Sequence, residues 1–293
     1  MSKKHILGII FVFLSAVIFG FTPVLANISY SGGNNGVNMA FLRALLPLPI
    51  LFALGWGKGT NARPTAGQLR RGVLVGVLQF GCTLMLYCSY SYISVGVATT
   101  LHFLYPLFVV GWNAFTTRRM PGKLKLAGLL LGVTGAASLI ELGEGGMSPV
   151  GVTLALLSGV VFAAYIIAVQ KEGQQPLPLY QLMAVLSLTG VVMCGGMGLA
   201  MGKITFQLTP QAWGYAAACA LLVSIGGSAL FQAGIRRVGD ADAAIYSLLE
   251  PLTSIVFGVL LLGEALTVRK GFSSALILLG LLLTALADRP KKK

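Results

Sequence analysis

The sequence predicts an all-α membrane protein of ten transmembrane helices, arranged as two inverted five-helix repeats. Three observations predict this fold. The 293 residues are 56% hydrophobic and only 10% charged, which is more apolar surface than a single soluble core could bury. The apolar residues form runs of about 20 residues, the length that crosses a bilayer. The two halves of the chain also resemble each other in sequence.

Five apolar runs make up the first half. The opening run continues past Pro23 without a convincing small-x-small cleavage site, so we interpret it as a span and not as a cleaved signal peptide. Pro47 and Pro49 are expected to kink the second run. A short hairpin near Ser94 separates the third and fourth runs, because one fused helix would far exceed a single crossing. The predicted spans are 6–29, 37–57, 70–93, 95–116 and 123–141.

The second half repeats this order of five runs. Its third and fourth runs are again joined by a short hairpin, here near Gly239. The predicted spans are 149–170, 179–201, 211–235, 241–262 and 270–287. We assign the two repeats to residues 1–145 and 146–293.

The positive charges predict the orientation of the chain. Of the 21 Lys and Arg residues, seventeen fall in loops and termini on one side of the predicted membrane and Arg43 falls inside a span; the other side has Lys203, Arg269 and Lys270. By the positive-inside rule, both termini are expected in the cytoplasm, as in a multi-pass protein of a bacterial inner or plasma membrane. The net charge of +13 therefore reflects topology, and no nucleic-acid partner is expected.

Several classes of function are disfavoured by what the sequence lacks. The four cysteines lie in apolar runs without a CxxC pair, and the chain has only two histidines, so neither a disulfide framework nor a metal site is predicted. The sequence has no GxSxG or HExxH motif and no pair of carboxylates within the spans, so an enzyme is not indicated. A repeated selectivity filter or ring of pore charges, typical of channels, is also missing. We expect no cofactor.

An internal repeat gives the strongest functional indication. With a shift of 145 residues, 98–107 aligns with 243–252 without a gap, and Lys125 and Gly135 align with Lys270 and Gly280. A shift of 143 aligns the opening spans of the two halves. Since five spans is an odd number, the second half must be inverted relative to the first. Inverted repeats give two nearly equivalent conformations, open to either side of the membrane, which is the geometry of alternating access.

Two segments of the second half carry a family resemblance: Ser247-Leu248-Leu249-Glu250-Pro251-Leu252 and Leu261-Leu262-Gly263-Glu264-Ala265-Leu266-Thr267. They resemble the EamA family of the drug/metabolite transporter superfamily, and the resemblance covers essentially the whole chain. It implies ten helices in two inverted halves and the export of amino acids or related metabolites. The first half departs from the motif, with Tyr105 in place of Glu250 and Arg119 in place of Glu264.

Glu250 is the first candidate for a substrate-binding residue. A charge near the bilayer centre costs a few kcal/mol, so this carboxylate must face water or a partner, or be protonated. Tyr246, Ser254 and Phe257 share its helical face. Glu250 either binds a substrate amine or carries a coupling proton, or it forms a hydrogen bond between helices that fixes their packing.

Arg43 is the other charged residue well inside a span. Its planar guanidinium could bind a substrate carboxylate. Alternatively, it is a structural arginine that binds loop carbonyls or extends toward the outer surface. A direct Arg43–Glu250 pair is a third reading.

Polar and aromatic residues at helical spacing complete the predicted cavity. His102 lies on one face with Thr99, Pro106 and Asn113, beside Tyr105. Its ring is either a packing element or a proton relay. Other predicted wall residues, each alternatively an ordinary interhelical contact, are Gln79, Tyr87, Tyr165 and Gln232.

The sequence as a whole predicts a secondary transporter that exports small metabolites such as amino acids by alternating access. The alternative is an efflux carrier for drugs or cationic compounds. The expected partners are a small-molecule substrate and the lipid bilayer, and a homodimer is left open.

Overall fold

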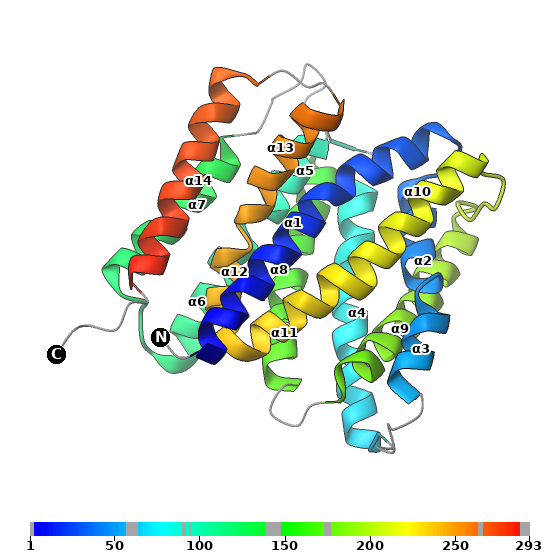
Figure 1. Ribbon diagram of the computed structural model, residues 1–293, viewed down its shortest axis with the longest axis horizontal. Coiled ribbons are helices and arrows are strands. Elements are labelled where there is room, and N and C mark those ends of the chain that lie inside the picture. Colours follow the sequence, from blue (N-terminus) through cyan, green and yellow to red (C-terminus); the bar gives the residue numbers. More distant parts are fainter. Residues whose placement is uncertain are drawn as a thin grey trace.

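The computed structural model describes residues 3–56, 64–89, 92–93, 95–138, 148–172, 177–262 and 266–287. Within these ranges the regular secondary structure is entirely helical (Figure 1). The elements are α1 Lys3–Ser31, α2 Gly36–Leu45, α3 Leu48–Trp56, α4 Ala66–Ser89, α5 Val95–His102, α6 Tyr105–Thr117, α7 Lys123–Ala137, α8 Pro149–Glu172, α9 Leu179–Ala200, α10 Pro210–Leu221, the π-helix η1 Leu222–Gly227, α11 Ser228–Val238, α12 Asp240–Tyr246, α13 Leu249–Leu262 and α14 Val268–Ala287.

Seven helical runs of the described chain are long and apolar enough to cross a membrane. They are Lys3–Ser31, Gly36–Trp56, Ala66–Ser89, Pro149–Lys171, Leu179–Ala200, Pro210–Val238 and Asp240–Leu261. Seven of the predicted spans therefore have a counterpart of full length. In the other three predicted spans the structure has the pair α5 and α6, the helix α7, and the helix α14. These are not among the seven runs, so the number of ten transmembrane helices stays a prediction. Gly263-Glu264-Ala265 of the family motif lies outside the described residues.

Two of the predicted spans are interrupted at equivalent places. The span 95–116 breaks at residues 103–104, between α5 and α6, and the span 241–262 breaks at residues 247–248, between α12 and α13. Each following helix carries a proline within its first three positions, Pro106 and Pro251. Proline has no backbone N–H to donate and is therefore tolerated in the first turn of a helix, whereas further along it would remove a hydrogen bond. The prolines thus begin new helices.

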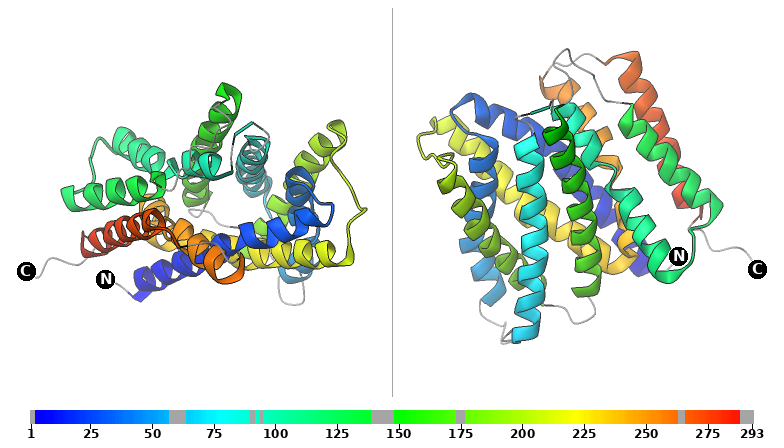
Figure 2. Two further views of the ribbon diagram at one scale, coloured as in Figure 1. Left: turned by 90° about the horizontal axis from the view of Figure 1, so that it is seen from above. Right: turned by 180° about the vertical axis from the view of Figure 1, so that it is seen from behind.

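The helices pack in pairs that match between the two halves. α1, which begins the first half, packs on α11 of the second half. α8, which begins the second half, packs on α4 of the first half. α7 and α14, which end the two halves, pack on each other. α1 and α8 run in opposite directions (Figures 1 and 2). A duplicated chain with its second copy inverted has this arrangement.

Apolar side chains cover much of the outer surface. Phe115 is 80% exposed and Leu260 is 70% exposed, and many other leucines and valines of the helices are also exposed. In water such a surface would be a liability, but in a bilayer it contacts lipid. The interior contains one large cluster built mainly from α1, α6, α8, α11 and α12, and most of the candidate site lies beside it.

Candidate functional site

The two helix breaks contact each other at the centre of the protein. The Tyr105 hydroxyl, at the start of α6, lies 2.5 Å from the Ser247 hydroxyl, in the break between α12 and α13. Ser247 donates its own proton to the Ala244 carbonyl at 2.9 Å, so Tyr105 must be the donor to Ser247. This hydrogen bond joins the first half of the chain to the second.

Aromatic rings form a continuous wall next to this contact. His102 ends α5, and its Nδ1 lies 3.0 Å from the Ser158 hydroxyl of α8. Its ring lies 5.1 Å from that of Phe162, which stands edge-on to Tyr105 at 4.7 Å. These separations are typical of attractive aromatic pairs. His102 and Tyr105, predicted to share a site, do lie together.

Tyr165 and Gln232 extend this wall toward α11. The Gln232 side-chain amide donates to the Tyr165 hydroxyl at 3.3 Å, and both residues are buried. The Oε1 atom of Gln232 is buried without a hydrogen-bond partner in the described structure. A buried polar atom without a partner costs roughly 1–3 kcal/mol, so this oxygen is a candidate acceptor for a ligand or a water molecule.

Arg43 lies on α2 and is held by a neighbouring helix. Its Nη1 donates to the Tyr87 hydroxyl of α4 at 3.1 Å, and its backbone carbonyl accepts from the Ser224 hydroxyl of η1 at 2.8 Å. The Nε atom is buried and has no hydrogen-bond partner among the described residues. Tyr30 of α1 also interacts electrostatically with this guanidinium. Arg43 is therefore fixed in position with part of its donor set unused.

Glu250 lies in the first turn of α13, immediately after the second break, and is half-buried. Its carboxyl group is within electrostatic range of Arg43, Cys82 and Tyr105. Both Glu250 and Arg43 belong to the described residues, and there they form no direct ion pair. No described side chain donates a hydrogen bond to the Glu250 carboxylate. The structure thus places one cationic and one anionic group, from opposite halves, around the same central region.

Three residues predicted to share a face with Glu250 pack against α1. Tyr246 is fully buried with its ring edge-on to Phe13 at 5.5 Å, Ser254 donates to the Gly20 carbonyl at 3.1 Å, and the Phe257 ring lies near that of Phe21. Because the helix is interrupted at residues 247–248, Tyr246 belongs to a different helix from the other two. Contact of Tyr246 with substrate stays a prediction.

Gln79 lies on α4, half-buried, with a buried side-chain Oε1 that has no hydrogen-bond partner in the described structure. Its backbone carbonyl accepts from Thr83 one turn later, at 3.0 Å. The predicted site residues thus fall on α2, α4, the two broken helices, α8 and α11.

Sequence reasoning missed several residues of this region. Ser158 lies four residues before Phe162, and Phe162 lies three residues before Tyr165. This spacing places all three on one face of α8. That face could have been found from Tyr165 alone. Ser247 stands in the quoted family motif, but its partner Tyr105 is 142 residues away, so no local pattern indicated the contact.

Comparison with known proteins identifies the family. Residues 6–140 and 149–286 each match the EamA-like transporter family, so the family pattern occurs twice and covers nearly all of the chain. The chain belongs to the EamA-like transporter family. The predicted resemblance is confirmed, and so is the two-repeat architecture.

Relatives in three bacteria are described as transporters. The chain is 25% identical to an uncharacterized transporter of Synechocystis, over 94% of this chain and 92% of the relative. It is 26% identical to the uncharacterized transporter YcbK of Bacillus subtilis, over 88% and 86%. It is also 26% identical to the uncharacterized inner membrane transporter YicL of Salmonella typhimurium, over 98% and 97%.

A solved crystal structure of a protein superimposes on this EamA-like chain with a TM-score of 0.81. The two share 18% sequence identity, and the match covers 98% of this chain and 99% of the other. At this identity the likeness shows the fold alone. Taken with the family match, the protein is a multi-pass membrane transporter of the EamA type.

Proposed function

We propose that this EamA-like protein exports a zwitterionic metabolite of about amino-acid size by alternating access. The observation that supports this most directly is the pair of opposite charges at the centre. Arg43 comes from the first half and Glu250 from the second, and they interact electrostatically without forming an ion pair. A substrate carboxylate would bind at Arg43 and a substrate ammonium group at Glu250.

The surroundings of the two charges favour a substrate with an apolar or aromatic part. The rings of His102, Tyr105, Phe162 and Tyr165 form one side of the region. Ligand sites for small organic molecules commonly combine such apolar walls with a few polar contacts. The unsatisfied Oε1 of Gln232 would supply one of these contacts.

Alternating access fits the two-repeat architecture. The proposed site lies where the broken helices of the two halves meet, and in transporters with inverted repeats the substrate binds near the midplane at such breaks. With both termini in the cytoplasm, as the charge distribution predicts, export would move substrate toward the end of the protein that contains the 202–209 segment.

The proposal is tested first by ligand-dependent thermal unfolding of the purified protein. A panel of amino acids, nucleosides, polyamines and cationic drugs is added, and a ligand that binds the folded state raises the melting temperature. We expect a shift with amino acids that is lost in Glu250→Gln. The matched control is Glu172→Gln, the same change of carboxylate to amide at the last residue of α8.

Counterflow in proteoliposomes then tests transport itself. Unlabelled substrate inside should accelerate uptake of labelled substrate in the wild type and in Glu172→Gln, but not in Glu250→Gln. Unchanged counterflow in both Glu250→Gln and Tyr246→Ala would show that the proposed site is wrong. Uptake without any acceleration by internal substrate would indicate a channel.

A second candidate is an efflux carrier for organic cations. One observation favours it: Arg43 already donates to Tyr87, whereas the Glu250 carboxylate receives no hydrogen bond from the described side chains. In that case Glu250 alone would recognise the substrate. Melting shifts would then come from polyamines or cationic drugs, and they would persist in Arg43→Gln.

A further inference from the structure

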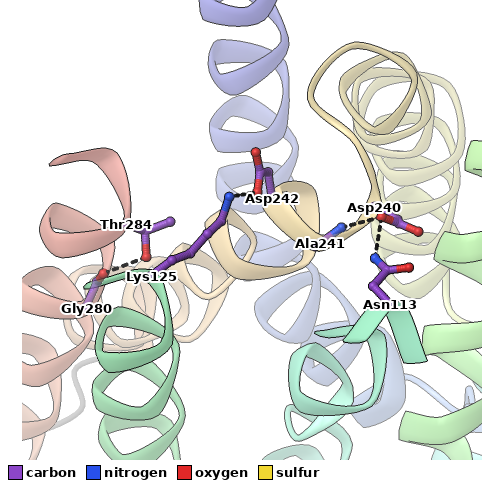
Figure 3. A network of polar contacts seen from close by, with 7 residues as sticks. All are labelled: Asn113, Lys125, Asp240, Ala241, Asp242, Gly280 and Thr284. Atoms are coloured by element: carbon purple, nitrogen blue, oxygen red, sulfur yellow. Dashed lines mark hydrogen bonds and ion pairs between the residues drawn. The ribbon is translucent and has the colours of Figure 1, made fainter. Parts of the chain in front are cut away.

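A polar cluster outside the candidate site joins the two halves at one end of the protein. Lys125, in the first turn of α7, forms an ion pair with Asp242 of α12 (Figure 3). Beside it, the Asn113 side-chain amide of α6 donates to Asp240 Oδ1 at 2.7 Å. We call these four residues the latch. Both contacts connect a helix of the first repeat with the start of α12 in the second.

The ion pair of the latch is largely buried, and the carboxylate of Asp240 is held in position by a backbone hydrogen bond. The Lys125 and Asp242 side chains are 19% and 15% exposed. Asp240 Oδ1 also accepts from the backbone N–H of Ala241 at 2.7 Å, which fixes the carboxylate at the start of α12. The turn before it passes through Gly239 at φ 94°, a conformation that favours glycine. The carboxylates are therefore held in place by the local fold of α12.

A cavity of about 220 Å³ lies next to the latch and is lined by Asn113, Arg119 and Lys125 together with apolar residues that include Ala241. It is bounded by α6 and α7 on one side and by α12 on the other. The two repeats are therefore less tightly packed here than in the core. At this point the latch adds polar contacts to the apolar packing of α6 and α7 against α12.

The latch occupies the end of the protein where α1 begins and α14 ends (Figure 1). Near the start of α1, Gly8 packs against Arg237 and Val238, directly before α12. Among the described residues of the predicted cytoplasmic side, Lys123 at the start of α7 and Arg237 at the end of α11 belong to this end.

No equivalent latch is encoded at the opposite end. With the repeat shift of 145 residues, Lys125 corresponds to Lys270, but Asp242 corresponds to Val97 and Asp240 to Val95. Asn113 corresponds to Gly258. The carboxylates and the amide are therefore missing from the corresponding positions. The opposite end has other contacts between the repeats, such as Arg269 Nε donating to the Ser138 carbonyl at 2.5 Å and Asn38 Nδ2 donating to the Thr205 carbonyl at 2.9 Å. The two ends, which an exact inverted repeat would make equivalent, are therefore held by different interactions.

We propose that the Lys125–Asp242 and Asn113–Asp240 contacts form the cytoplasmic gate of the transporter, closed in this structure and broken when the site opens to the cytoplasm. The inference rests on the proposed alternating-access function. Loss of the ion pair would raise the population open at this end, because it removes an interaction present only in the closed state.

A native cysteine provides the measurement. Cys82 is 4% exposed and lies within electrostatic range of both Arg43 and Glu250, so its modification reports water access to the central site. A charged, membrane-impermeant maleimide is applied to sealed membrane vesicles of either orientation, and modification of Cys82 is followed by peptide mass mapping. In Lys125→Met we expect labelling from the latch side to be about five-fold faster than in the wild type, the change that about 1 kcal/mol produces in a two-state equilibrium.

Three further variants make the result specific. The charge exchange Lys125→Asp with Asp242→Lys should restore slow labelling, because the pair is rebuilt in reverse. Asn113→Ala, which keeps the ion pair, should give a smaller increase and serves if Lys125→Met is poorly folded. Lys123→Met is the matched control: it removes an exposed lysine two residues away, and labelling should not change.

Unchanged labelling of Cys82 in both Lys125→Met and Asn113→Ala would overturn the gate, and so would an equal increase from both faces, which indicates general loosening. The measurement requires no substrate. If it failed while Glu250→Gln still abolished ligand shifts and counterflow, the gate would be wrong and the transport function would stand.

Discussion

At the scale of single residues, Arg43 is held in a way that suits the proposed contact with a substrate carboxylate. Tyr87 holds one end of the guanidinium, and Ser224 donates to the Arg43 backbone carbonyl. The Nε edge is left without a partner in the described structure. A planar guanidinium fixed in this way can present two parallel N–H groups to a carboxylate. A flexible ammonium group at the same position would present only a point charge.

We therefore expect Arg43→Lys to weaken binding of a carboxylate-bearing substrate by about ten-fold or more, which corresponds to about 1.4 kcal/mol. The charge remains, but the fork of donors and the Tyr87 contact are lost. Affinity is measured from the concentration dependence of the thermal shift. Tyr87→Phe is the control: it frees the guanidinium without removing it, and affinity should fall less. Equal affinity of Arg43→Lys and wild type would exclude a bidentate contact with substrate.

At the scale of elements, the pair α7 and α14 depends on glycine. A Cβ atom on Gly280 would lie 2.5 Å from the Gly128 carbonyl and 2.7 Å from the Gly132 backbone N. Both obstacles are backbone atoms, which cannot move aside as a flexible side chain can. Small residues at such crossings let two helices approach closely in a membrane, where packing and not water drives their association.

Gly280→Ala is therefore expected to lower the free energy of unfolding by about 1–3 kcal/mol, the usual cost of overpacking. The change is read from the melting temperature of the purified protein. Gly271→Ala, on the same helix with open space around its Cβ, should be neutral or slightly stabilising because alanine favours the helix. If both variants had the same melting temperature, the close contact at Gly280 would not contribute to stability.

At the scale of the whole molecule, the predicted orientation assigns the two ends to different sides of the membrane. The exposed residues Lys123 and Gln207 lie at opposite ends: Lys123 begins α7 beside the latch, and Gln207 lies near Gly33, beyond the end of α1. The positive-inside rule then places Lys123 in the cytoplasm and Gln207 outside.

We expect an impermeant thiol reagent to label Gln207→Cys in intact cells and to label Lys123→Cys only after the cells are opened. The reagent cannot cross the bilayer, so the pattern reports the side directly. The unmodified protein corrects for labelling of the four native cysteines. Labelling of both introduced cysteines in intact cells, or the reverse pattern, would contradict the predicted orientation.

The sequence predicted features that depend on composition and periodicity better than those that depend on distant contacts. The apolar runs and the aligned residues indicated the helices and the repeat, and two short motifs in the second half indicated the family. The interruptions at 103–104 and 247–248 were not expected, because a proline within an apolar run is compatible with either a kink or a new helix. As a result, Tyr246 was placed on one continuous helical face with Glu250.

The candidate site shows the same division. Arg43 and Glu250 stood out because charge inside an apolar span is costly. The two residues are more than 200 positions apart in the sequence. The sequence therefore could not show that both lie near the centre without forming an ion pair. The Tyr165–Gln232 hydrogen bond and the partners of His102 also depend on how α8 packs against its neighbours.

The π-helical segment Leu222–Gly227 shows that this site depends on chain length as well as on residue identity. The two repeats align with a shift of 143 residues at their first spans and 145 at their fourth, so the second repeat is two residues longer over the interval that contains this segment. A π turn holds more residues than an α turn. Deleting two residues there is one more than reversion to an α turn would absorb, and it would rotate α11 by about 100° relative to α10. Gln232 would turn away from Tyr165 although no residue of the site had been substituted.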